Sequence, residues 1–410
     1  MELAGHEGVL HHPVCRRWRG RRYVCCLLLA TVAAGRAEAA EWSAEPAMSV
    51  KGEYNSNLII TAGPHQPTYG RWISPSVKFA GSTENLELTG RLAADFVGYT
   101  GDIDRSLTNL YFPLSAKYSF DRETVGFDGG FTRDNTLMGE LLQTGVVLSF
   151  TQRNAWNATP SWRHAFSERL SLDAAYTFSS STYENGARLG LLDYTVHTGT
   201  GGMSYRLTEQ DQVQMIGTYT DFRIPEAGRL RSEIVGGQLG YQRDFDQTLS
   251  LRVMGGGQIV RSTVRFGPFR LQDSQLIWIG TASLKKQWDN GSLEVSGARE
   301  IFPSGFGLLV QTDRIGVTLS RTVSEHLTAA LVTNLFWAAG VTEQGTSSFF
   351  PRNRFVYVSP KLSWRFNEWW TAEAAYTHAD RRVDATAEHG VSHAATLTVT
   401  YQPHKFTVGR

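Results

Sequence analysis

Cysteine is scarce in this chain of 410 residues, which contains only Cys15, Cys25 and Cys26. All three precede a predicted signal-peptide cleavage site at about residue 39, so we expect none in the mature chain. Disulfides, a thiol nucleophile and a cysteine metal site are then excluded, and no cysteine is left for a lipoprotein anchor. No CxxCH motif occurs, so the chain cannot itself carry a c-type haem.

The predicted signal peptide covers residues 1–39. A basic segment with five arginines precedes an apolar stretch at 24–34, which is too short to cross a bilayer as a helix. Ala37-Glu38-Ala39 fits a small-residue cleavage site. The twin arginines lack the rest of a Tat pattern, so the sequence favours Sec export.

Long apolar runs and an excess of charge are also missing. Residues 40–410 hold no 18 consecutive apolar residues, and the mean hydropathy is −0.26, which argues against helices that span an inner membrane. Lys and Arg number 40 and Asp and Glu 39, a net charge of +1. Such a balance argues against nucleic acid as a partner. An exported chain can still be integral to a membrane as a closed β-barrel, because only alternate residues must face lipid.

What the chain does have is a recurring sequence pattern: alternating apolar and polar residues, a short polar turn, and then a second alternating segment. It occurs, for example, at 165–176, 205–215, 243–253, 321–331 and 364–376. Its spacing of about 40 residues corresponds to two strands, one tight turn and one longer loop. Soluble repeat folds share this period, but exported chains with strands of this length favour a transmembrane barrel.

We predict an all-β, up-and-down antiparallel transmembrane β-barrel of about 18 strands over residues 48–410, with 16 or 20 as alternatives. Residues 40–47 are expected to form a short periplasmic segment before it. The predicted strand cores are 48–58, 71–81, 86–99, 107–120, 125–135, 146–166, 170–182, 194–207, 213–223, 232–245, 249–265, 275–288, 292–302, 308–321, 327–340, 354–366, 370–383 and 393–403. Connections after even strands are short, as at Asn290-Gly291, and those after odd strands are longer, as at 59–70 and 341–353. This asymmetry is typical of periplasmic turns and extracellular loops, and it argues against a soluble β-sandwich.

Strict alternation assigns side chains to the lipid or to the lumen. In 356–366, for example, the apolar Val356, Leu362 and Trp364 alternate with Lys361 and Arg365. The predicted lumen-lining residues are Glu87, Arg91, Asp95, Lys117, Arg163, Asp173, Arg252, Glu294, Lys361, Arg365 and Glu373. They suit a hydrated channel for a neutral or mixed polar solute, or pairs of charges that brace the wall; both interpretations can hold together.

Aromatic residues near strand ends, such as Trp162, Trp288 and Trp364, are interpreted as an interfacial girdle. Stacking on sugar rings is an alternative for aromatic residues in loops or in the lumen. The candidates for sugar contact are Tyr69, Phe269, Phe349, Phe350 and Tyr357.

No catalytic or cofactor motif is found. His378, His389 and His393 match no zinc spacing, and Gly255-Gly256-Gly257 has neither the following helix nor the Lys-Ser/Thr of a phosphate loop. Ser and His residues show no spacing typical of a catalytic triad. We therefore expect no enzyme activity, no metal and no cofactor.

The segment Glu53-Tyr54-Asn55-Ser56-Asn57, the pattern at 362–376 and a last strand ending Leu397-Thr-Val-Thr-Tyr-Gln-Pro403 resemble a group of bacterial outer-membrane β-barrels found with exopolysaccharide secretion loci. The group includes PEP-CTERM/exosortase-associated barrels and porin-like partners of polysaccharide-export proteins. The resemblance implies passage of a polymer across the outer membrane, with a periplasmic polysaccharide-export protein as a partner.

The leading hypothesis is therefore an outer-membrane, porin-like channel that exports a polysaccharide or another polar polymer. A diffusion or uptake porin for small polar solutes, and a barrel that sheathes a partner protein, are the alternatives. The expected surroundings are outer-membrane lipid outside and a polar solute inside.

Overall fold

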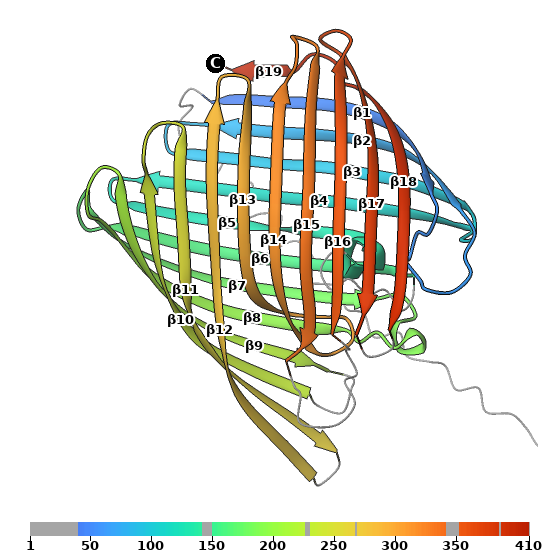
Figure 1. Cartoon of the computed structure of the whole chain (residues 1–410). Helices are drawn as coiled ribbons and strands as arrows, with labels where there is room; N and C mark the ends of the chain where they lie inside the picture. The colour runs from blue at the N-terminus through green and yellow to red at the C-terminus, as the bar shows by residue number, and fades with distance from the viewer. Residues whose placement is uncertain are drawn as a thin grey trace, which may run out of the picture.

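The computed structural model describes residues 40–141, 150–225, 230–266, 269–341, 352–384 and 387–409. Within these ranges the chain forms one continuous antiparallel sheet, in which each of the first eighteen strands pairs with its neighbours in sequence. The first strand, β1 (Glu41–Asn55), also pairs with the eighteenth, β18 (Glu388–Tyr401). The sheet therefore closes into a barrel (Figure 1). In Figure 1 the strands of the two facing walls cross, as expected for strands that tilt around a closed barrel. No helix among the described residues is long and apolar enough to cross a membrane.

The strands of the first half are β1 (Glu41–Asn55), β2 (Thr68–Ser82), β3 (Leu86–Gly101), β4 (Arg105–Phe120), β5 (Glu123–Asn135), β6 (Gln152–Ala165), β7 (Leu170–Tyr183), β8 (Tyr194–Arg206) and β9 (Asp211–Ile224). Those of the second half are β10 (Leu230–Asp244), β11 (Leu249–Phe266), β12 (Phe269–Trp288), β13 (Gly291–Pro303), β14 (Leu309–Thr322), β15 (Leu327–Gly340), β16 (Asn353–Arg365), β17 (Trp370–Val383), β18 (Glu388–Tyr401) and β19 (Phe406–Gly409). Two short helices, η2 (Leu137–Leu141) and η3 (Gly186–Leu189), lie in the connections. Each of the eighteen predicted strand cores overlaps one of β1–β18, so the predicted fold class is confirmed. Residues 146–149 of the sixth core lie outside the described residues.

The two ends of the chain differ from the prediction. Residues 41–47, expected as a separate segment, are the first half of β1 and pair with β2. On their other side Glu41–Ala44 pair with β19, a short strand that was not predicted. Pro46 and Pro403 lie beside or within these paired segments, and proline in a sequence pattern argues against a strand. The pairing between β1 and β19 was therefore not predicted. The predicted signal peptide, residues 1–39, lies outside the described residues.

Six of the eight short turns share a common cap, which explains the recurring polar residues in the sequence pattern. In each, a side-chain oxygen accepts a hydrogen bond from the backbone N–H three residues later, an arrangement typical of Ser, Thr, Asp and Asn in turns. The capping residues are Thr83, Ser167, Thr208, Asp246, Ser324 and Asn367. At Asp246, the hydroxyl and backbone N–H of Thr248 both donate at 2.6 Å and lower the pKa of the Asp246 carboxyl.

Prolines interrupt several ladders inside the wall. The β6–β7 register omits Thr159 and Pro160, and the β16–β17 register omits Ser359 and Pro360, because proline has no N–H to donate. At both gaps a hydroxyl pair bridges the same two strands: the Oγ1 atoms of Thr159 and Thr177 lie 3.1 Å apart, and Ser359 Oγ lies 3.1 Å from Thr377 Oγ1. These pairs partly replace the missing ladder bonds.

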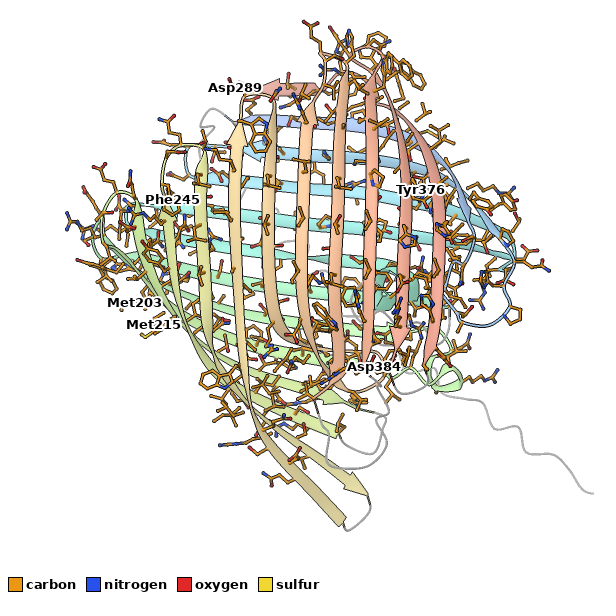
Figure 2. The ribbon with its side chains drawn as sticks, viewed as in Figure 1. Met203, Met215, Phe245, Asp289, Tyr376 and Asp384 are labelled. Carbon is orange, nitrogen blue, oxygen red and sulfur yellow. The ribbon has the colours of Figure 1, made fainter. Side chains whose placement is uncertain are left out.

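The outer face of the barrel is apolar and exposed, the reverse of a soluble protein. Leu92, Phe96, Leu362 and Leu397 are each more than half exposed, and Met203 and Met215 project outward from β8 and β9 in Figure 2. The aromatic residues expected at strand ends are exposed next to the short turns: Tyr118, Phe120, Trp162, Phe166, Tyr205, Phe245, Trp288, Trp364, Phe366, Trp369 and Trp370. A closed barrel with an apolar outer band and an aromatic girdle spans a membrane. The protein is located in the outer membrane.

Candidate functional site: the lumen and its roof

A cavity of about 660 Å³, lined by both polar and apolar side chains, lies in the lumen beside β1, β2 and β15–β18. Two ion pairs lie on its wall: Lys51 Nζ is 3.2 Å from Glu53 Oε2, and Lys361 Nζ is 3.0 Å from Glu373 Oε2. The Lys51 ammonium also lies 3.5 Å from the centre of the Trp72 ring, a cation–π contact. Hydroxyl groups line the wall between and above these pairs, from Ser74, Ser359, Thr377, Ser392, Thr396 and Thr398.

All eleven predicted lumen residues lie on the inner face. Asp95, Lys361 and Glu373 line the cavity just described. Arg91 lines a second cavity, and a third, towards the short turns, is lined by Lys117, Arg163 and Asp173. The remaining four contact neighbouring strands or a turn. The carboxylate of Glu87 lies 3.6 Å from the Lys117 ammonium, and Glu294 is opposite Lys285 in the strand register. The Arg252 guanidinium donates to the Gln242 side-chain oxygen at 2.9 Å, and that of Arg365 donates to the Glu325 carbonyl in a short turn.

Several inner-face charges are therefore paired across neighbouring strands. Besides the pairs above, the Arg153 guanidinium contacts both carboxylate oxygens of Asp134, at 2.9 and 2.7 Å. Charges paired on the wall leave little net field for a solute of one sign. The wall can therefore hold water and polar solutes without strong charge selection.

The five candidates for sugar contact differ in whether they lie in the lumen. Tyr357 lines the lumen cavity. Tyr69 does not: β2 begins at Thr68, so Tyr69 is a strand residue that shares the outer face with Ile73 and packs against Tyr54 with ring centres 5.6 Å apart. The prediction for Tyr69 is thus wrong, because the strand starts earlier than its pattern indicated. Phe269 begins β12, but its side chain lies outside the described set, and Phe349 and Phe350 lie outside the described residues.

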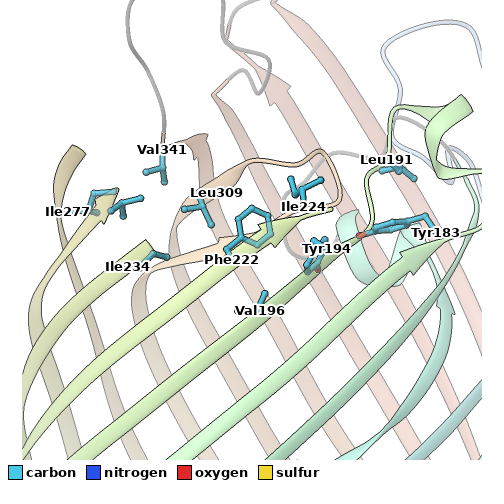
Figure 3. Packing of buried hydrophobic residues seen from close by; sticks show 11 residues of the cluster. Tyr183, Leu191, Tyr194, Val196, Phe222, Ile224, Ile234, Ile277, Leu309 and Val341 are labelled. Carbon is cyan, nitrogen blue, oxygen red and sulfur yellow. The ribbon is translucent and has the colours of Figure 1, made fainter. Parts of the chain in front are cut away.

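An apolar roof lies at the extracellular end of the lumen, where polar residues give way to a buried cluster (Figure 3). Tyr194, Phe222 and Ile234 come from the inner face of the strands, and Leu191 comes from the connection 184–193. This connection meets the connection 304–308, since the Leu192 N–H donates to the Gly305 carbonyl at 2.7 Å. Gly307, at φ +77°, fits against Leu192 so closely that an added Cβ would lie 2.7 Å from Leu192 Cδ1. The two connections leave the barrel between β7 and β8 and between β13 and β14, so their contact joins distant parts of the rim.

The first extracellular connection also folds inward. Leu58 and Ile60 line the lumen cavity, and Ile60 packs in a buried cluster with Leu137, Leu141 and Phe336. Asn57 holds the connection: its Nδ2 donates to the carbonyls of Thr61 and Val391 at 2.9 and 3.2 Å, and its Oδ1 accepts from the Thr61 N–H.

Sequence reasoning did not find the roof or Asn57. The roof contacts join segments more than 100 residues apart, and alternation within strands carries no information about them. The only local sign at Asn57 is an Asn in a connection, which is ordinary turn chemistry. Among the described residues, no three His, Cys, Asp or Glu side chains are grouped so that they could hold a metal ion.

Comparisons with known proteins give structural likenesses only. No family model matches the sequence, and no curated protein matches it. Among solved structures, the chain is similar to OpdL of Pseudomonas aeruginosa at 10% identity, with 90% of this chain and 99% of that chain covered and a TM-score of 0.43. It is similar to OccK7 (OpdD) of the same organism at 10% identity, covering 89% and 98%, with a TM-score of 0.46. For OccAB4 of Acinetobacter baumannii the identity is 10%, the coverage 91% and 99%, and the TM-score 0.44.

Proposed function

We propose that the protein is a porin-like channel through which small polar solutes cross the outer membrane. The observation that carries this proposal is a lumen lined by hydroxyl groups and paired charges beneath an apolar roof. The polar wall replaces part of a solute's hydration, and the paired charges favour neutral or zwitterionic solutes over ions of one sign. Transport would be passive.

The same roof weighs against the polymer export that the family resemblance implies. A polysaccharide chain would have to displace the contact of Leu192 with Gly305 and the buried cluster around Phe222. A small solute needs only the space beside these segments. Neither a polymer nor a periplasmic export partner is needed to account for the lumen.

The test is solute entry into liposomes that contain the refolded mature chain. We expect mono- and disaccharides to enter at rates well above those of empty liposomes, while long dextrans are excluded. Heat-modifiable migration on a gel should first show that the barrel is folded. Equal entry of long dextrans would contradict the proposal, and so would a folded barrel that admits no solute.

A further inference from the structure

A row of five ionisable side chains and one tryptophan crosses the outer face of β13–β18 near the extracellular end. In register it runs Arg299, Asp313, Trp337, Arg354, Arg382 and His389, one residue from each successive strand. These residues share the face that carries the exposed Ile315, Leu362 and Leu397. The row therefore lies on the membrane side of the wall and not in the lumen.

The depth of the row corresponds to the lipid headgroups. Ten residues separate Arg354 from Trp364, which lies in the aromatic girdle next to the short turns. At about 3.3 Å per residue and a tilt of about 40°, this is about 25 Å along the barrel axis. The apolar band of such barrels is also about 25 Å tall. Arg354 and its neighbours thus reach the opposite interface, and Trp337 beside them is a typical interfacial residue.

Within the described residues the patch has four arginines, Arg299, Arg352, Arg354 and Arg382, against three carboxylates, Asp313, Asp380 and Asp384. Asp384 lies next to Arg352, since its backbone N–H donates to the Arg352 carbonyl at 3.0 Å. Arg354 lies directly opposite Arg382, and like charges in that position destabilise a sheet unless an anion lies between them. The Asp380 carboxylate contacts the Arg382 guanidinium at 3.5 Å and the His389 ring at 2.7 Å. The Asp313 carboxylate forms an ion pair with Arg299 at 3.0 Å. No described carboxylate pairs with Arg354 or with the nearby exposed Arg352.

A small hollow adjoins Arg352. It has a volume of about 220 Å³ and is lined by Gln311, Asp313, Trp337, Ala338, Ala339 and Arg352. It lies on the outer side of β14 and β15, where a lipid headgroup can reach it from the membrane. Guanidinium groups bind phosphate oxygens through paired hydrogen bonds.

We propose that Arg352, Arg354 and Arg382 form a binding site for the phosphate group of an outer-leaflet lipid. Its headgroup lies between the guanidinium groups at the interface, and its acyl chains run down the apolar face of β15–β17. A bound phosphate relieves the repulsion between Arg354 and Arg382. The site is distinct from the lumen and takes no part in solute passage.

The test is binding of short-chain phosphatidic acid to the full mature barrel in a neutral detergent, followed by native mass spectrometry and by the shift in melting temperature. We expect wild type to bind it and to be stabilised, with no such effect from the matched diacylglycerol. R354E/R382E should bind at least about tenfold more weakly, since each charged contact contributes about a factor of ten. R354Q/R382Q tests the same loss without new negative charge. The control K286E reverses one charge on the outer face near the short turns and should bind like wild type.

Unchanged binding in both double variants would overturn the proposal. Inorganic phosphate that binds as tightly as phosphatidic acid would also overturn it, because the site would then recognise a free ion and not a lipid. Loss of solute entry with lipid binding intact would count against the proposed channel alone.

Discussion

At the residue scale, Asn57 and Ile60 show how one side chain holds a strained segment inside the barrel. Ile60 has φ +52°, a left-handed conformation that is costly for a β-branched residue. Three hydrogen bonds of the buried Asn57 side chain compensate. Gly390 leaves room for the loop, since a Cβ there would lie 2.4 Å from the Ile60 carbonyl oxygen.

Asn57→Ala should therefore release the connection 56–61 from the lumen. Loss of three hydrogen bonds, at about 1 kcal/mol each, removes about 3 kcal/mol that opposes the strain at Ile60. Single-channel conductance should rise or become noisy, and the connection should become sensitive to added protease. Asn157→Ala, which changes another lumen-lining asparagine, should leave both unchanged. Unchanged conductance in the Asn57 variant would contradict this role.

The Lys361–Glu373 pair allows a direct test of the lumen assignment. Lys361→Glu places two carboxylates on the same wall and should shift the reversal potential towards cation selectivity. The swap K361E/E373K restores one charge of each sign and should bring the reversal potential back to that of wild type. K286E, on the outer face, should have no effect. A fixed reversal potential in Lys361→Glu would mean that permeating ions do not pass this wall.

At the element scale, local pattern predicted the strands well and the connections poorly. The eighteen strand cores were found because alternation and turn caps such as Ser324 and Asn367 are local properties of the sequence. Lumen residues followed from the same alternation, as Lys361 and Glu373 show. Tyr69 was misassigned because its strand extends beyond the pattern. The roof depends on contacts between distant connections, which a pattern of period two does not encode.

Gly307→Ala should disturb the roof specifically. Both Gly307, at φ +77°, and Gly190, at φ +72°, are left-handed, but only at Gly307 would a Cβ press on Leu192, at 2.7 Å, and on Ile224, at 3.0 Å. The backbone cost of about 1 kcal/mol is common to both substitutions. Gly190→Ala is therefore a matched control, and only Gly307→Ala should raise solute entry into liposomes. Equal entry in the two variants would show that the 184–193 and 304–308 contact does not limit passage.

At the scale of the whole molecule, closure of the barrel rests on the pairing of the two ends of the chain. β18 pairs with the second half of β1, from Met48 with Tyr401 to Asn55 with Ala394. β19 pairs only with Glu41–Ala44, after a break that contains Pro403. Closure therefore has two parts, and the longer one does not involve β19.

Deletion of residues 403–410 should leave the barrel closed. The ladder between β1 and β18 is retained, and all four residues of β19 are exposed, so we expect heat-modifiable migration to persist with a slightly lower melting temperature. Deletion of residues 388–410 removes β18 as well and should abolish the folded band, because β1 and β17 would become open edges in lipid. If the shorter deletion already prevents refolding in detergent, then β19 is required for closure and the ladder from Met48 to Asn55 is not sufficient. If it refolds in detergent but fails to assemble in cells, residues 403–410 are needed for assembly and not for closure of the barrel.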